Sequence, residues 1–457
     1  MLDDLPVTLD RAAAEPLSVQ VADALRAAAT GGLLRVADRL PSTRALAARL
    51  GVSRAVVAAA YDQLHAEGWI GGRRGSGTYL TAAPRSAPTR GPAAADTDAG
   101  GDLLDLSPGS PCVDAIDRAA WRRAWRAAAD TAPGLFKERA GLTAYCDAVA
   151  EHLLRHRGLA AGPDSVVLAT AGTSSAAGEL AGAVLAPGDA VAIEDPGYLR
   201  AAGALRAAGV EPVPVPVDAD GLVVERVPPG VRAVYCTPAH QFPLGARMPA
   251  ARRVELVEFA RRTGTFVIED DYDGELRYDT APLPLLAAMA PDVVVHLGTT
   301  SKILSTTLGV GWLVARPDIA EAVVAHRIRT GTAPAPAGQL VLAELAAHGD
   351  LARHLRRLRR TVPPRRALVV GALRERGVPV LGDDAGSHVV VELPTAAAER
   401  AAVAAARARG VLLDGLARHH LGAPHRFGVA LGYTALPVPD LADAAAVAAD
   451  CLSAVVA

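Results

Sequence analysis

The sequence predicts an α/β protein in two parts: a small amino-terminal winged helix-turn-helix, and a large domain built on a mainly parallel sheet of seven strands. Three observations predict this arrangement. Residues 1–80 and 104–457 differ in pattern and are separated by a stretch rich in Pro, Ala, Gly and Asp. The larger part alternates helical segments with short apolar runs, which is typical of a sheet covered by helices on both faces. Hydrophobic residues make up 51% of the 457 residues, enough for each part to bury a core.

The amino-terminal part shows helix signals in a regular order. Apolar residues at helical spacing predict a helix over residues 17–30, which ends at a pair of glycines. Ser42 is placed to N-cap a short second helix, and Gly51 can adopt the left-handed conformation that ends it. Ser53 is placed to N-cap a third helix over about residues 54–67. We therefore expect a helix-turn-helix.

A β-hairpin is expected after the third helix. WIGGRRGSGTYL, residues 69–80, has apolar ends around a Gly-rich turn, which predicts a wing with Arg73 and Arg74 at its tip. Between residues 35 and 80 seven arginines face three acids, although the whole chain has a formal charge of -2. The third helix would present Ser53 and Arg54 at its N-terminus, as a helix that enters the DNA major groove must.

The segment between the two parts, residues 81–103, is expected to be a flexible linker. It has neither helical nor strand periodicity. As a coil it would separate its ends by about 25 Å, which would let the two parts reorient.

The large domain is expected to span residues 104–457, with a large part over about 135–345 and a smaller α+β lobe over about 346–457. The runs predicted to be strands of the sheet are SVVLAT, AVAIED, EPVPVPV, RAVYCT, TFVIED, DVVVHLG and GVGWLVA. In the lobe the strand candidates are SHVVVEL, GVLLD and RFGVAL.

Composition argues against several classes of protein. The cysteines lie far apart without a C-x-x-C pair, so neither a metal site nor a disulfide framework is expected. No apolar run reaches the ~18 to 20 residues that span a bilayer, and the acidic start MLDDLPVTLD is unlike a signal peptide. We therefore expect a cytoplasmic protein.

The large domain carries residues that suit one cofactor. Pyridoxal phosphate needs an amine for its aldehyde, an acid for its pyridine nitrogen, a donor for its phenolate, a ring on its face and a phosphate cup. Lys302 offers the amine, and Asp270, at a strand end, can pair with the pyridine nitrogen. Tyr198 can stack on the ring, and Tyr272 can bind the phenolate. The candidates for the phosphate cup are Gly172, Thr173, Ser174, Thr299 and Ser301.

The amino-terminal part resembles the winged helix-turn-helix of GntR-type bacterial regulators. LPSTRALA, GVSRAVV, AYDQLHAEG and GSGT match the family motif in order, within residues 17–80. One departure is the apolar pair Ala55 and Val56 after the Ser-Arg pair, which can make only apolar contacts such as those with thymine methyl groups. The resemblance places Arg44, Ser53, Arg54 and the wing around Gly75 to Thr78, which includes Gly77, on double-stranded operator DNA. Arg73 and Arg74, at the tip of the wing, are further candidate contacts.

The large domain resembles the fold-type I aminotransferases, and more closely the aminotransferase-like domain of the MocR subfamily of GntR regulators. EDPGY, TPAHQFPLG, IEDDYDGELRY and GTTSKIL carry the resemblance, together with the order of the two domains. The resemblance implies that Lys302 bonds covalently to the aldehyde carbon of pyridoxal phosphate. It also implies that Arg426 grips an amino-acid carboxylate, the alternative being a surface arginine at a strand start. His240 and Gln241 would lie on the phenolate side, either as contacts or only as parts of a turn.

The main departure from the family lies after the lysine. The family usually has an arginine that pairs with the cofactor phosphate seven positions later, where this chain has Gly309. Loss of one charge-assisted bond weakens binding by ~1.5 to 3 kcal/mol, roughly ten- to over a hundred-fold, unless a hydroxyl within residues 305–307 substitutes. The cofactor is therefore expected to be weakly held or absent. Three neighbouring acids are expected to be solvated: Asp271, Asp273 and Glu275.

These features predict a DNA-binding transcriptional regulator that holds pyridoxal phosphate on Lys302 and senses an amino acid, an amine or a B6-related effector, without net catalysis. The resemblance implies a head-to-tail homodimer whose two winged helices read paired half-sites. Two alternatives stay open. One is a working aminotransferase, and the other is a regulator that has lost the cofactor and senses another small molecule.

Overall fold

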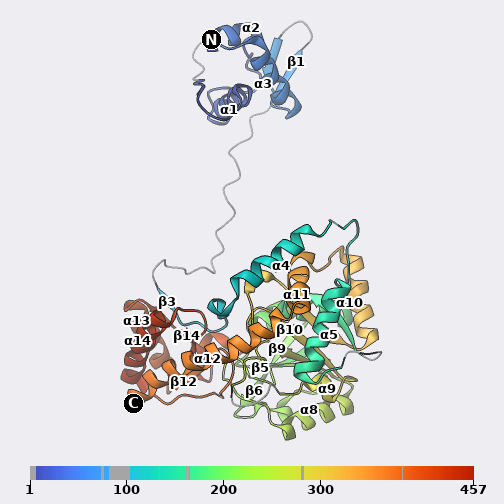
Figure 1. The fold of residues 1–457 in the computed structure, drawn as a ribbon, viewed down its shortest axis with the longest axis vertical. Helices are drawn as coiled ribbons and strands as arrows, with labels where there is room; N and C mark the ends of the chain where they lie inside the picture. The colour runs from blue at the N-terminus through green and yellow to red at the C-terminus, as the bar shows by residue number, and fades with distance from the viewer. Residues whose placement is uncertain are drawn as a thin grey trace. The chain divides into compact units, whose positions relative to one another are not determined.

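The chain divides into two compact units, one within residues 1–98 and one within residues 99–457 (Figure 1). Among the residues that the computed structural model describes, no helix has the length and apolar character to cross a membrane. The described residues are 7–73, 77–81, 103–132, 134–160, 162, 165–278, 283–382 and 384–456.

The first unit is a winged helix-turn-helix, as predicted. Its core is formed by the apolar faces of the three helices and by the two strands, with Val21, Leu46 and Val57 fully buried. The elements are α1 (Leu17–Thr30), α2 (Thr43–Leu50), α3 (Arg54–Ala66), β1 (Ile70–Arg73) and β2 (Gly77–Leu80).

The predicted helix boundaries have the expected physical causes. The hydroxyl of Ser42 accepts a hydrogen bond from the Ala45 N–H, and that of Ser53 accepts one from the Val56 N–H. Gly51 ends α2 in the left-handed conformation at φ 63°, where a side chain would be strained. The turn between α2 and α3 is therefore fixed by local sequence.

The second unit is built on an eight-stranded sheet with the order β4-β11-β10-β9-β8-β5-β6-β7. All seven predicted strands are present, and the predicted number is one too few because β7 forms a short hairpin with the end of β6. Strands β7 and β11 run antiparallel to their neighbours, and the remaining pairs are parallel. The strands are β4 (Val166–Thr170), β5 (Ala190–Asp195), β6 (Glu211–Asp218), β7 (Gly221–Leu222), β8 (Ala233–Cys236), β9 (Phe266–Asp271), β10 (Val294–Thr299) and β11 (Gly311–Ala315).

Helices bury both faces of this sheet. On one face α6 (Thr173–Val184), α7 (Leu199–Ala207) and α10 (Pro317–Thr330) pack on strand residues such as Ile193 and Leu297. The other face carries a larger apolar cluster, which continues into the carboxy-terminal lobe. Among the helices that contribute to this cluster are α4 (Arg118–Asp130), α5 (Thr143–Arg157), α8 (Ala250–Thr263), α9 (Leu286–Met289), α11 (Pro336–Ala347) and α12 (Asp350–Glu375).

The carboxy-terminal lobe is α+β, as predicted. Its three-stranded sheet has the order β12-β15-β14, and a separate two-stranded sheet joins β13 to β3 in parallel. The segment that begins the second unit is thus paired with a lobe that comes much later in the sequence. The lobe's elements are β3 (Leu104–Asp105), β12 (His388–Leu393), α13 (Ala396–Ala408), β13 (Val411–Leu412), β14 (Asp414–Gly415), the 3-10 helix η4 (Leu416–His419), β15 (Phe427–Gly432) and α14 (Val438–Val456).

One edge of the large sheet collects the predicted cofactor residues. The strand register aligns Thr170, Gly311 and Thr299 across β4, β11 and β10. On the next strand Asp270 lies opposite Leu297 of β10. The carboxyl ends of the parallel strands therefore meet at this edge, the usual place for a ligand site in such folds.

Candidate functional site

Lys302 lies in the turn that follows β10, and its amine is directed at the beginning of the second unit. Its Nζ donates a hydrogen bond to the carbonyl oxygen of Gly109 at 2.5 Å. A Cβ on Gly109 would lie 2.8 Å from this nitrogen, so a side chain there would displace the amine, and it would also be strained at φ 103°. Burial lowers the pKa of Lys302, while the charges of Asp273 and Asp270 oppose this effect. A lysine with a lowered pKa is more often neutral and thus a better nucleophile.

Asp270 is a buried carboxyl group with one oxygen unused. Its Oδ2 accepts a hydrogen bond from the hydroxyl of Tyr235, whereas Oδ1 has no hydrogen-bond partner among the described residues. Burial raises the pKa of Asp270 to about 7, and the Tyr235 hydrogen bond acts in the opposite direction. A protonated ring nitrogen would supply the missing donor and hold the carboxyl group ionised. In this respect Asp270 fits the pyridine nitrogen of pyridoxal phosphate.

The candidate phosphate residues come together from two segments. Gly172 precedes α6 with φ 127°, and a Cβ there would lie 3.6 Å from the Thr299 hydroxyl. That hydroxyl is 3.0 Å from the Ser301 hydroxyl and accepts from the Ser301 N–H at 3.1 Å. The free N–H groups at the start of α6 and these hydroxyls can therefore form one anion cradle. Thr173 and Ser174 begin the same helix.

Tyr198 is joined to this cradle. The Ser174 hydroxyl donates to the Tyr198 hydroxyl at 3.0 Å. Burial raises the pKa of Tyr198. The Tyr198 ring also meets the Phe242 ring edge-on, with 5.9 Å between the centroids. Tyr198 is thus fixed at both ends beside the proposed cofactor position.

Tyr272 contacts His240, a residue that the sequence left open as either a contact or only a part of a turn. Nδ1 of His240 lies 3.0 Å from the Tyr272 hydroxyl and 3.0 Å from Asp273 Oδ2. Burial raises the pKa of Tyr272 well above its ordinary value. Gln241 instead holds the turn, since its Nε2 donates to the backbone oxygen of Pro196 at 3.0 Å. Of the two loop residues, His240 makes the contact and Gln241 shapes the loop.

The expectation that three neighbouring acids are solvated was wrong. Asp271 forms a bidentate ion pair with the fully buried Arg157, and Asp273 pairs with His240. Although burial opposes it, the hydrogen bond from His152 and the charge of Arg157 lower the pKa of Glu275 to about 2. The prediction failed because Arg157 lies 114 residues before Asp271, so that no local pattern in the sequence reveals the pair.

Arg426 is not joined to this group of residues by any contact that the structure shows. It lies just before β15, and its Nε donates to Glu392 Oε1 on β12 at 2.8 Å. An effector carboxylate would have to compete with Glu392 for the guanidinium group. The role of Arg426 therefore stays a prediction.

Gly309 ends the 3-10 helix η3 (Thr306–Leu308) in the left-handed region at φ 63°. A side chain at this position would be strained whatever space surrounds it. The hydroxyls of Ser305 and Thr307, considered as substitutes for the missing arginine, hydrogen-bond to each other at 2.8 Å. The turn is thus built for glycine.

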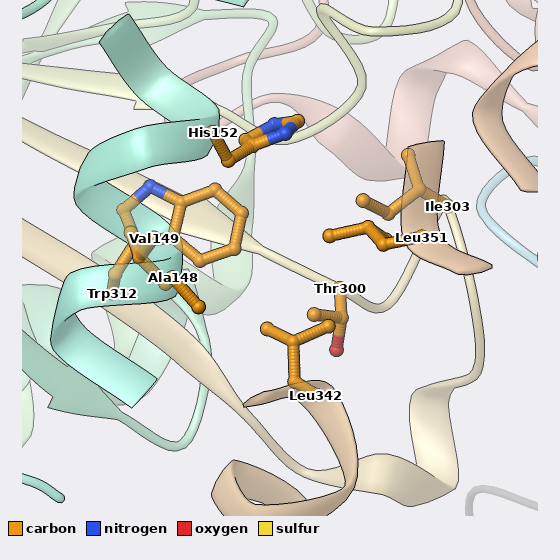
Figure 2. Close-up of a pocket in the computed structure, with 8 residues that line it drawn as sticks. All are labelled: Ala148, Val149, His152, Thr300, Ile303, Trp312, Leu342 and Leu351. Atoms are coloured by element: carbon orange, nitrogen blue, oxygen red, sulfur yellow. The ribbon is translucent and has the colours of Figure 1, made fainter. Parts of the chain in front are cut away.

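A small apolar cavity lies beneath the Lys302 turn (Figure 2). Its volume is about 10 Å³, which is room for about one water molecule and not for a cofactor. Figure 2 shows His152 and Trp312 on one side and Ile303 and Leu351 on the other. The turn that carries Lys302 therefore rests on packed apolar side chains, which hold its position.

Functional residues that the sequence analysis missed are Tyr235 and Gly109. Tyr235 lies opposite Ile268 on the neighbouring strand, two residues before Asp270. Among the predicted strands of the large domain, only the RAVYCT run contains a tyrosine, which is a usable signal. Gly109 lies 193 residues from Lys302, and nothing in its local sequence indicates the contact.

The predicted DNA-contacting side chains of the first unit are exposed at the start of the two helices. Arg44, Ser53 and Arg54 are all exposed. Nε of Arg54 donates to the Thr43 hydroxyl at 3.3 Å, which ties the N-terminus of α3 to that of α2. Gly77 starts β2 with φ 113°. Arg74 and the side chain of Arg73 lie outside the described residues.

Comparisons with known proteins agree with the two-part organisation. Residues 17–80 match the family model of bacterial regulatory proteins of the gntR family, and residues 101–431 match that of aminotransferase class I and II. The chain is 35% identical to the HTH-type pyridoxine biosynthesis transcriptional regulator PdxR of Corynebacterium glutamicum, over 82% of each chain. It is 32% identical to the probable rhizopine catabolism regulatory protein MocR of Rhizobium meliloti, over 94% of this chain and 92% of that protein. Among solved structures it is similar to the kynurenine aminotransferase of Pyrococcus horikoshii, with a TM-score of 0.70 and 26% identity, over 77% of this chain and 91% of that one.

Proposed function

This chain belongs to the MocR subfamily of GntR-type transcriptional regulators, and from that premise we propose that its aminotransferase-like unit holds pyridoxal phosphate on Lys302 and senses an amino acid, an amine or a B6-related molecule. The fold family of that unit is pyridoxal-phosphate-dependent. The observation that carries the proposal is the buried Asp270, whose Oδ1 has no partner among the described residues and whose charge acts on the Lys302 amine. Two chemically complementary groups of the cofactor, its ring nitrogen and its aldehyde, match these two side chains.

The residues of the site divide the work of binding. When bound, pyridoxal phosphate supplies an aldehyde carbon at which primary amines exchange. Lys302 offers a half-buried amine of lowered pKa. Asp270 would hold the ring nitrogen protonated, Tyr198 would cover one face of the ring, and Tyr272 would donate to the phenolate oxygen.

The phosphate would be held without a charged partner at position 309. The N–H groups at the start of α6 and the hydroxyls of Thr299 and Ser301 are the donors available. Because the charge-assisted bond is missing, we expect binding weaker by ~1.5 to 3 kcal/mol than in relatives that have the arginine. Weak binding suits a sensor that responds to the supply of the vitamin itself.

The chain would act on DNA as a homodimer with a head-to-tail arrangement, so that two winged helices read paired half-sites. Its relatives of matching length are named as transcriptional regulators, which favours sensing over aminotransferase turnover. An effector must prefer one arrangement of the dimer in order to change DNA binding.

The cofactor part is tested with the purified full chain. Pyridoxal phosphate is added, the mixture is reduced with borohydride, and the peptides are analysed by mass spectrometry. We expect the coenzyme mass on the peptide with Lys302 in the wild type and none in Lys302→Ala. A wild-type Lys302 peptide that stays unmodified at saturating coenzyme would contradict the proposal that Lys302 holds pyridoxal phosphate.

The DNA part is tested separately, with DNA that the wild-type protein selects from a random pool. We expect Arg54→Ala to bind this DNA more weakly, with a shallower salt dependence if the arginine contacts phosphate. Primary amines and amino acids are then added to the coenzyme-loaded wild type. A DNA affinity unaffected by every compound of the panel, and by the coenzyme itself, would contradict the sensing role.

A further inference from the structure

Three buried residues near Tyr272 form a cluster with the chemistry of metal ligands. His240, Asp273 and His388 each offer one donor atom, and these atoms lie within 4.8 Å of one another. The exposed fractions of the three residues are 2%, 2% and 2%. They come from three separate segments: the loop after β8, the loop after β9, and the start of β12.

Both imidazoles keep one ring nitrogen unused. Nε2 of His388 lies 2.8 Å from the Pro243 carbonyl oxygen, and because a carbonyl only accepts, this nitrogen carries the proton. Nδ1 of His388 is then a buried lone pair without a partner among the described residues. In His240, Nδ1 contacts Asp273 and Tyr272, while Nε2 has no described partner. A buried polar atom without a hydrogen-bond partner destabilises the folded state, so two of them in one cluster require an explanation.

We propose that His240, Asp273 and His388 bind a divalent metal ion of intermediate softness, of which Zn²⁺ is the example. Two imidazoles and one carboxylate are a common ligand set for such ions. The hydrogen bond from His388 to a backbone carbonyl is the outer contact that usually orients a ligating histidine. The fourth ligand is water or the Tyr272 hydroxyl, which already lies 3.0 Å from His240 Nδ1.

The three donor atoms lie within 4.8 Å of one another, and binding one ion would draw the most distant pair closer together. Ligand atoms of a tetrahedral zinc site lie roughly 3.3 Å apart, which follows from metal–ligand distances of about 2.0 to 2.1 Å. Nδ1 of His240 and Asp273 Oδ2 are already 3.0 Å apart. Nδ1 of His240 would be the ligand atom, and a change of tautomer would place the ring proton on Nε2. The cysteine pattern gave no hint of this site, because all its ligands are histidine and aspartate from distant segments.

The ion would also affect the candidate cofactor site. Nδ1 of His240 contacts both the Tyr272 hydroxyl and Asp273 Oδ2. The charge of Asp273 adds to the burial that raises the pKa of Tyr272. A metal that takes the lone pairs of His240 and Asp273 would leave that hydroxyl as a ligand or as a donor to the cofactor. The site itself does not depend on the cofactor, so it is tested on the coenzyme-free protein.

The test uses the full chain, stripped of metal with a chelator and free of coenzyme. Zn²⁺ is titrated in competition with a coloured chelator, and Co²⁺ is titrated by visible absorption. We expect one ion per chain, bound more tightly than about 1 μM, and the intense cobalt bands of a low-coordinate site. His388→Gln and Asp273→Asn should each weaken binding roughly 100-fold. The matched control is His425→Gln, which removes another close histidine pair, with His420 at 4.7 Å between ring centroids, and should change nothing.

Two results would overturn the proposal. One is a wild-type chain that binds neither ion at this affinity, in which case buried water satisfies the two lone pairs. The other is binding that is lost in His425→Gln and kept in His388→Gln and Asp273→Asn. If the core variants do not fold, hydrogen exchange of the wild type decides: Zn²⁺ should protect residues 237–246 and 386–393, and protection confined to residues 419–425 contradicts the site.

Discussion

Two buried carboxyl groups at the same sheet edge make the cofactor-free protein sensitive to pH. Burial raises the pKa of Asp270 to about 7 and that of Glu194 to about 7. Glu194 Oε1, like Asp270 Oδ1, has no described hydrogen-bond partner. A raised carboxyl pKa means that the folded state binds more protons than the unfolded state between the two pKa values. The free energy of unfolding therefore falls as the pH rises through this range.

The first prediction concerns Asp270→Asn without coenzyme. The variant should lose much of this pH dependence, because one of the two carboxyl groups no longer has to ionise inside the protein. We expect the stability difference between variant and wild type to shift in favour of the variant by roughly 1 to 3 kcal/mol from about pH 5 to about pH 8. Denaturant unfolding at several pH values measures it. The exposed Asp220→Asn is the control, and parallel curves for Asp270→Asn and wild type would contradict the burial argument.

At this scale the sequence was sufficient to predict side chains with special chemistry, but not their partners. Lys302 and Asp270 lie in motifs with ordered neighbours, so their place at the sheet edge follows from strand order. Tyr235, Gly109 and Arg157 act through contacts with residues far away in the chain, and such contacts depend on the packing of the whole unit.

At the scale of elements, the loop over residues 237–246 connects the carboxy-terminal lobe to the edge of the large sheet that carries Asp270 and the candidate phosphate residues. The Phe242 ring meets Tyr198 and Tyr272 at 5.9 and 6.0 Å between centroids, and it meets His388 and His419 of the lobe at 5.6 and 5.1 Å. The lobe in turn pairs with β3 through β13. The segment that begins the second unit is thus attached to the lobe that Phe242 touches.

The second prediction is that Phe242→Leu uncouples the lobe from the cofactor. In the wild type, added pyridoxal phosphate should change the hydrogen exchange of β12 and η4. The smaller side chain should reduce this change while coenzyme binding stays within about threefold, and it should cost about 1 to 3 kcal/mol of stability through lost packing. Phe259→Leu, on α8 and partly buried against the larger apolar cluster of the second unit, is the matched control. An unaltered exchange response in Phe242→Leu would disprove the coupling.

The elements that the sequence missed are the short ones. β3 and β7 each contain two residues, too few for an alternating pattern, whereas the predicted strand GVLLD contains β13. For β7 there was a signal in the turn sequence DADG before Leu222, which is typical of a hairpin. The prolines of β6 did not prevent its prediction as a strand. They are tolerated because β7 pairs only with the last two residues of β6, so that half of the N–H groups of β6 need no partner.

For the whole molecule, an exposed apolar pair identifies a candidate surface for dimer formation. Leu135 and Phe136 are 92% and 87% exposed. The residues that follow are fixed, because Lys137 donates to the Gly331 carbonyl at 2.6 Å and Arg139 to the Arg327 carbonyl at 2.5 Å. Two adjacent large apolar side chains held in water are costly, and a second copy of the chain would cover them.

The last prediction follows from this surface and from the paired half-sites expected of a dimer. Leu135→Ser combined with Phe136→Ser should convert the protein to a monomer, as measured by analytical ultracentrifugation. Binding to one half-site should remain, because the first unit has a core of its own. Affinity for the paired site should fall by roughly 100-fold, because the two winged helices would then bind their half-sites independently of each other. Val438→Ser, which removes an exposed apolar residue of the carboxy-terminal lobe, should leave both unchanged. A double variant that still sediments as a dimer would place the interface elsewhere on the second unit.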